Sequence, residues 1–85
     1  PRATIDSQIP ANGTRLCIPK KNVPGMIAKF TTILGDAKLN IAGIVDQSRG
    51  DIAYNLIDVD GKVGEETLNL LKDCEAVISV RPIFA

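Results

Sequence analysis

The sequence has no histidine and no tryptophan, and its aromatic residues are one tyrosine and two phenylalanines. Histidine is the commonest general base and the commonest transition-metal ligand, so its absence argues against a catalytic centre. RNA-binding sheets stack bases on outward-facing aromatic rings, and this chain has too few rings for that mode of binding. We therefore expect no catalytic residue and no nucleic-acid partner.

The chain also lacks an excess of charge of either sign, because ten basic residues balance ten acidic residues. A balanced charge creates no long-range field that would attract a polyanion. No apolar run approaches the roughly 20 residues that cross a bilayer, so we expect a soluble, cytoplasmic protein without a membrane partner. The two cysteines, Cys17 and Cys74, are too far apart in sequence for a metal-knuckle spacing. We expect two reduced, buried thiols, with a single disulfide as the alternative.

Several aspartates surround a predicted hairpin and raise the question of a metal site; they are Asp46, Asp51, Asp58 and Asp60. They lack the fixed alternation of a calcium-binding loop. Turns are rich in aspartate and glycine for backbone reasons alone. We therefore expect no metal, and keep a hard-metal site only as a minor alternative.

The length of 85 residues allows one domain with a thin core. Residues 1–14 are rich in polar and turn-forming residues, and we expect them to be a linker from a missing upstream catalytic domain. Residues 15–85 are expected to form the folded domain. The chain opens at Pro1 without methionine, as an excised piece of a longer protein would; the alternative is a poorly ordered terminus of a complete small protein.

Hydrophobic periodicity and turn residues predict four strands and two helices. The strands are expected at 15–18, 40–48, 52–59 and 75–84, and the helices at about 24–38 and 62–73. Pro19 is expected to end the first strand, because proline cannot donate to a ladder, and Pro82 suits an edge strand. Right-handed crossovers then give an α+β fold, a ferredoxin-like βαββαβ sandwich. Its four-stranded antiparallel sheet has the order 4-1-3-2, with both helices on one face.

The loop before the first predicted helix is the best candidate for a ligand site. A helix start with unpaired N–H groups, flanked by Lys20 and Lys21, attracts a small carboxylate. Gly25 has no side chain to block the approach of a ligand. A purely structural interpretation remains open: Asn22 caps the helix, Pro24 starts it and the lysines are solvated.

Four motifs resemble those of the ACT family, in particular the ACT domain that closes bacterial D-3-phosphoglycerate dehydrogenases. They are Lys21-Asn22-Val23-Pro24-Gly25-Met26-Ile27, then Leu39-Asn40-Ile41-Ala42, then Ser48-Arg49-Gly50-Asp51 with Ala53-Tyr54, and Ile57-Asp58-Val59-Asp60-Gly61. The similarity covers about residues 15–84. The Asn-x-Pro-Gly loop followed by Asn-Ile-Ala is reasonably specific for this dehydrogenase branch.

The resemblance implies a regulatory ACT domain at 15–85 that forms a homodimer through side-by-side sheets and binds L-serine at the junction. Asn22 and Asn40 match the family's serine-contacting asparagines, with Asn40 contributed by the partner subunit. Lys20 falls where the best-known members carry a histidine, and the rest of the implied site is the loop Val23, Pro24 and Gly25. The fragment itself would need no cofactor, while the parent enzyme would use NAD. Two alternatives stay open: an ACT module that only dimerises, and a free-standing metabolite-binding protein.

Overall fold

The computed structural model describes residues 8–85. Along the chain lie β1 (Thr14–Lys21), α1 (Met26–Asp36), β2 (Ile41–Arg49), β3 (Ile52–Val59), α2 (Glu65–Lys72) and β4 (Arg81–Phe84). The predicted βαββαβ order is therefore confirmed.

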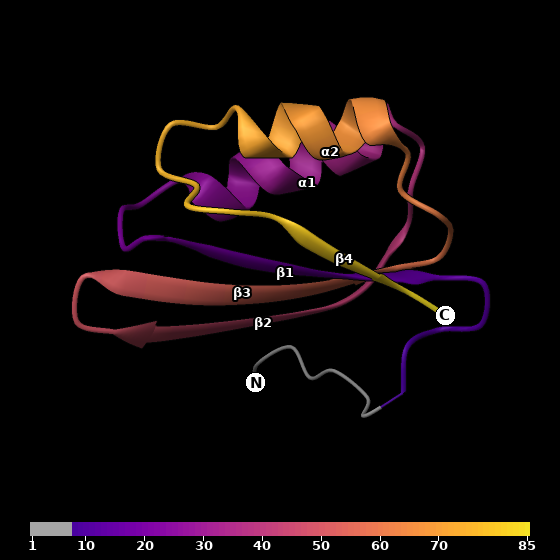
Figure 1. The fold of residues 1–85 in the computed structure, drawn as a ribbon, viewed down its shortest axis with the longest axis horizontal. Coiled ribbons are helices and arrows are strands. Elements are labelled where there is room, and N and C mark those ends of the chain that lie inside the picture. The colour runs from indigo at the N-terminus through magenta and orange to yellow at the C-terminus, as the bar shows by residue number, and fades with distance from the viewer. Residues whose placement is uncertain (1–7) are drawn as a thin grey trace.

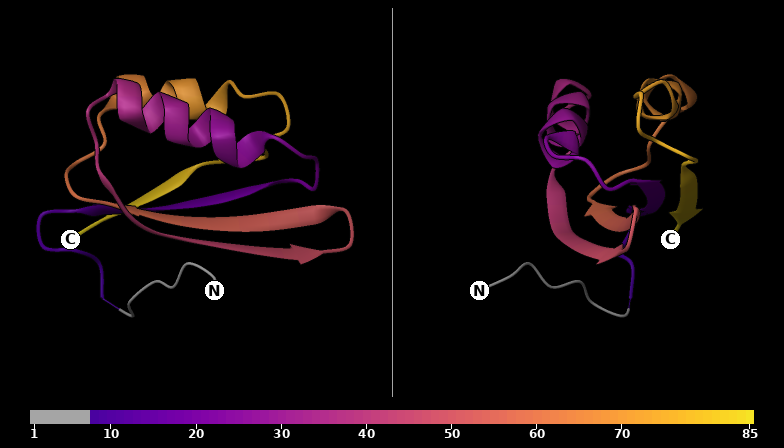
Figure 2. Two further views of the ribbon diagram at one scale, coloured as in Figure 1. Left: turned by 180° about the vertical axis from the view of Figure 1, so that it is seen from behind. Right: turned by 90° about the vertical axis from the view of Figure 1, so that its left-hand side faces the viewer.

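The four strands form one sheet in the order β2-β3-β1-β4, in which every neighbouring pair is antiparallel. This is the predicted order 4-1-3-2 written from the other side. Both helices cover the same face of the sheet, as the end-on view in Figure 2 shows, and they lie side by side above it (Figure 1). The ferredoxin-like fold is confirmed, and β2 and β4 are its edge strands.

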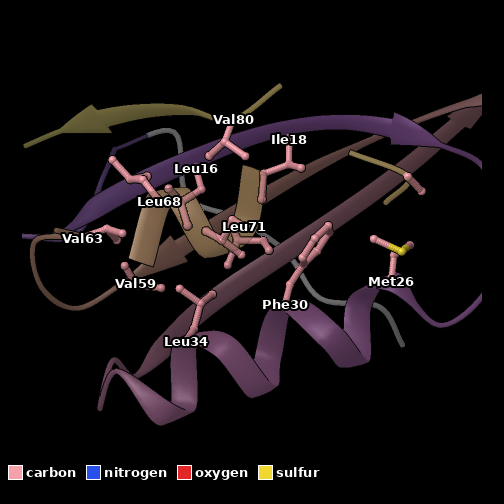
Figure 3. Packing of buried hydrophobic residues seen from close by; sticks show 12 residues of the cluster. Leu16, Ile18, Met26, Phe30, Leu34, Val59, Val63, Leu68, Leu71 and Val80 are labelled. Atoms are coloured by element: carbon pink, nitrogen blue, oxygen red, sulfur yellow. The ribbon is translucent and has the colours of Figure 1, made fainter. Parts of the chain in front are cut away.

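The core fills the space between the helices and the sheet. Because side chains alternate across a strand, every second residue of β1 and β3 faces the helices. From β1 these include Leu16 and Ile18, and from α1 the buried residues Met26, Phe30 and Leu34 point toward the sheet (Figure 3). The spacing of these three helical residues is the period-3.6 stripe that the sequence predicted.

An ion pair joins β1 to β3 on the opposite face of the sheet. Arg15 and Asp58 are direct cross-strand partners. The Arg15 guanidinium donates to both carboxylate oxygens of Asp58, at 2.7 and 2.9 Å, and the side chains are only 14% and 3% exposed. Two parallel hydrogen bonds in a nearly buried setting fix the register of the two strands.

The prediction that β1 ends near Pro19 is wrong, because β1 continues to Lys21. The N–H and C=O groups of a strand residue point to the same side, and the Pro19 carbonyl accepts from the Ile78 N–H on the β4 side. The missing N–H of Pro19 therefore affects the pairing with the last segment of the chain, while the ladder with β3 stays continuous.

The same proline explains why the last strand is shorter than predicted. We expected a strand over 75–84, but β4 covers only Arg81–Phe84 and pairs with the first half of β1. Beyond Pro19 the contact with β1 is reduced to single hydrogen bonds and an isolated bridge between Lys20 and Val77. Pro82 does lie in an edge strand, as predicted.

Both helices are shorter at their ends than predicted. α1 begins after Gly25, so Pro24 lies outside the helix, and it ends at Asp36, before Lys38 adopts a left-handed conformation with φ 62°. α2 has acidic residues in its first turn and Lys72 in its last, the arrangement that the helix dipole favours.

The predicted linker at 1–14 lies partly outside the described residues, since 1–7 are not described. β1 begins one residue earlier than predicted, at Thr14, whose buried hydroxyl donates to the Gly61 carbonyl at 2.7 Å. Both cysteines are unpaired and half-buried rather than fully buried. Within residues 8–85 neither helix has the length and apolar character needed to span a membrane.

Candidate functional site

The loop between β1 and α1 is held against the tip of the β2–β3 hairpin. The backbone N–H of Asn22 donates to the Asp51 carbonyl at 2.8 Å, and the Asn22 side-chain amide donates to the Gly50 carbonyl at 3.3 Å. Asn22 is therefore an anchor between two loops and not the helix cap, which corrects one of the structural interpretations of this residue. Its side chain stays exposed, so the second amide hydrogen and the carbonyl oxygen remain accessible.

The start of α1 leaves its first N–H groups without a side-chain cap. The N-cap residue is Gly25, which has φ 87° and ψ −4° and makes no side-chain hydrogen bond. The first N–H groups of any helix lack an intrahelical partner. They carry a partial positive charge that no side-chain cap at Gly25 neutralises.

A cavity of about 380 Å³ opens beside this helix start. It is lined by Lys20, Asn22, Val23, Pro24, Gly25, Met26, Ile27, Ala28 and Asp46. Five of the six predicted ligand-binding residues, Lys20 and Asn22 to Gly25, thus surround a single cavity. The cavity has the size and the mixture of apolar and polar lining expected for a small metabolite.

Lys20 is the least expected feature of this cavity. It occupies an inward-facing position near the end of β1 and is only 3% exposed. Across the described residues the structure gives it no hydrogen bond and no ion pair. A charged side chain is almost never buried without a partner, because burial removes its hydration.

Lys21 does not share this cavity with Lys20. The alternation along β1 sends the two side chains in opposite directions, and Lys21 lines a second cavity of about 350 Å³ between the same loop, Lys29 and Glu75. Both cavities touch the α1 start at Gly25 and Met26, so each lysine lies beside the helix start but in a cavity of its own.

Asp46 faces the same cavity from β2. Its Oδ1 accepts a hydrogen bond of 2.7 Å from Asn55, its direct cross-strand partner on β3. Sequence reasoning missed both residues as site components, since Asp46 was considered only within the aspartate group. A signal for Asn55 was available: it is the one polar residue among the inward positions Ala53, Asn55, Ile57 and Val59.

The remaining aspartates of that group are separated by the fold. Asp58 pairs with Arg15 on the far face, and the Asp60 carboxylate accepts from the Asn40 side chain at 3.0 Å. Among residues 8–85 no three His, Cys, Asp or Glu side chains come together in a way that could hold a metal ion.

Asn40, the sixth predicted residue, lies at the opposite end of the sheet from Asn22. It precedes Ile41, which pairs with Val59, whereas Asn22 follows Lys21, which pairs with Ile52. The length of β3 separates these ends by roughly 23 Å at 3.3 Å per residue. Within one chain the two asparagines cannot contact the same small ligand, so a contribution of Asn40 from a partner subunit stays a prediction.

Comparison with solved structures identifies the fold. The chain is similar to the ACT domain from the GTP pyrophosphokinase of Chlorobium tepidum, with a TM-score of 0.68 and 18% sequence identity over 84% of this chain and 96% of that one. It has the fold of an ACT domain. No protein-family model matches the sequence, and no curated protein matches it. At this level of identity the likeness establishes the architecture, and the function must be argued from the site.

Proposed function

We propose that this ACT-fold chain is an amino-acid-binding regulatory domain, and that it senses L-serine for feedback control of a D-3-phosphoglycerate dehydrogenase. The observation that carries the proposal is Lys20, which is only 3% exposed, has no hydrogen-bond or ion-pair partner among residues 8–85 and faces a cavity beside an uncapped helix start. The carboxylate of an amino acid would supply the missing anion, with further hydrogen bonds from the α1 N–H groups.

The sequence motifs support serine as the first ligand to test. Asn22 lines the cavity with amide groups left over from its loop contact. Amides supply both donors and acceptors for the polar groups of a small amino acid. In the proposed dimer, Asn40 of the partner would reach the same cavity, which makes ligand binding depend on assembly.

Regulation follows if the ligand favours one arrangement of the domain pair over another. A ligand shifts an equilibrium only by its difference in affinity for the two states. The segment 1–14 would then transmit the change to a catalytic domain upstream.

A second candidate function is a pure assembly module. The observation in its favour is that β2 lies at the edge of the sheet, so one side of this strand is open to pairing with a second copy. Assembly alone gives no reason for an unpartnered lysine in a cavity on the helix-facing side, and we therefore rank it second.

Isothermal titration of the chain with L-serine, glycine and L-threonine separates the two functions. We expect saturable binding of at least one of them, with Asn22→Ala and Asn40→Ala each weakening it while light scattering still shows a dimer. Asn69→Ala, an exposed change on α2, serves as the matched control and should bind normally. If the titrations show no binding of any of the three amino acids at millimolar concentration, only the assembly function is left.

A further inference from the structure

Three polar side chains lie on neighbouring strands on the helix-facing side of the sheet. They are Lys20 on β1, Asp46 on β2 and Asn55 on β3. Asn55 is 1% exposed, and the exposed Asp46 sits directly opposite it at the edge strand. Lys20 is opposite Ala53, two positions along β3. Neighbouring inward positions of a sheet bring such side chains within reach of one another.

The hydrogen bonding within this group is incomplete. The Asn55 amide nitrogen donates to Asp46, but the buried Asn55 Oδ1 has no partner in the described structure. Lys20 has no partner among residues 8–85 either, although the Asp46 carboxylate lines the same cavity. Polar groups in such a setting are normally satisfied, so an unpartnered lysine at the cavity wall, with an unsatisfied oxygen on the residue that holds Asp46, points to a group that arrives from outside.

The charges around the cavity restrict what that group can be. A simple anion would meet the Lys20 ammonium and the α1 N–H groups, but it would also face the carboxylate of Asp46. A simple cation would meet Asp46 and face Lys20. A molecule that carries both charges on neighbouring atoms satisfies both sides at once, because each charged end meets its opposite.

We propose that Asp46, oriented by Asn55, receives the ammonium group of an α-amino acid whose carboxylate is held by Lys20 and the start of α1. This inference rests on the proposed function and deepens it, since one chain then supplies contacts for both charged ends of the ligand. Asp46 is a specificity-determining residue in this arrangement. It rejects carboxylic acids that lack the amine, because they would leave its charge unpaired beside a bound anion.

The test is a calorimetric comparison of an amino acid with analogues that lack one charged group. The probe is the tightest binder among L-serine, glycine and L-threonine; for L-serine the analogues are 3-hydroxypropanoate, without the ammonium, and ethanolamine, without the carboxylate. The unmodified chain should bind the amino acid at least tenfold more tightly than either analogue. Asp46→Asn should weaken amino-acid binding at least tenfold. It should also bring the affinity for the amino acid closer to the affinity for the analogue that lacks the ammonium.

Two further variants make the outcome specific. Asp36→Asn makes the same charge change at an exposed site on α1 and should leave affinity and preference unchanged. Lys20→Met should instead bring the affinity for the amino acid closer to the affinity for ethanolamine, the analogue that lacks the carboxylate. Thermal unfolding of each variant shows that it is folded at the titration temperature.

The outcomes distinguish the two levels of the proposal. If the unmodified chain binds the amino acid but Asp46→Asn keeps both its affinity and its preference for the amine, the assignment of Asp46 is overturned and the amino-acid-binding function stands. If the unmodified chain binds none of the three amino acids, the proposed function fails and the assignment of Asp46 fails with it.

Discussion

Replacing Lys20 with methionine should stabilise the ligand-free chain while weakening amino-acid binding. Lys20 is only 3% exposed, and its ammonium has no hydrogen-bond or ion-pair partner in the part of the chain that the structure describes. Methionine has a similarly long, flexible and unbranched side chain, so it can fill the space now occupied by the lysine stem without carrying a charge. The substitution therefore removes the unpaired charge and keeps most of the packing.

The magnitude follows from the cost of burying an unpaired polar group, which is about 1–3 kcal/mol in protein mutational data. The cavity is open to water, which lowers the cost at this site, so we expect a gain of about 1–2 kcal/mol. In a domain of this size 1 kcal/mol shifts the melting temperature by about 4–8 °C. The Tm should accordingly rise by roughly 4–16 °C.

Thermal and urea unfolding of the ligand-free chain measure this change directly. Lys20→Ala is the matched comparison, because it removes the stem as well as the charge and should be about 2–5 kcal/mol less stable than Lys20→Met. A loss of stability in Lys20→Met of more than about 1 kcal/mol would refute the reasoning, since it would mean that the ammonium stabilises the ligand-free fold.

Two other predictions concern the frame around the site. Gly25→Ala places a side chain at φ 87° with no atom in the way, so it should lower the free energy of unfolding by about 1–2 kcal/mol through backbone strain alone. Gly35→Ala inside α1 should instead raise the free energy of unfolding by about 0.5–1 kcal/mol. Equal effects of the two substitutions in urea unfolding would contradict the strained N-cap. Asp58→Ala removes the two charged hydrogen bonds between Arg15 and Asp58 and should cost about 1.5–3 kcal/mol. Asp36→Ala at the exposed end of α1 should change the stability by less than about 0.5 kcal/mol, and a similarly small loss for Asp58→Ala would contradict the structural importance of this ion pair.

Much of the fold was predictable because local pattern and turn chemistry agree. The buried stripe of Met26, Phe30 and Leu34 has helical spacing, and the Arg49-Gly50-Asp51 turn separates two strands whose bounds lie within one residue of those predicted. Pro19 was misinterpreted because a sequence does not say which neighbour a strand residue hydrogen-bonds. Its missing N–H interrupts the contact with the segment before β4 and leaves β1 intact.

The site was only partly predictable for a similar reason. The loop from Asn22 to Gly25 is contiguous, so its residues necessarily lie together. The burial of Lys20 and its position across a cavity from Asp46 depend on three strands and a helix that meet only in the folded chain. Charged residues are usually solvated, and no local pattern marks an exception of this kind.

The most direct test of amino-acid sensing is to map L-serine onto the chain by backbone amide chemical shifts. We expect saturable shifts at Asn22, Val23, the segment 25–28 at the α1 start, and Asp46, because these residues line the cavity beside Lys20. Saturating shifts confined to other parts of the chain, or spectra unchanged at millimolar L-serine, would contradict serine binding at this cavity.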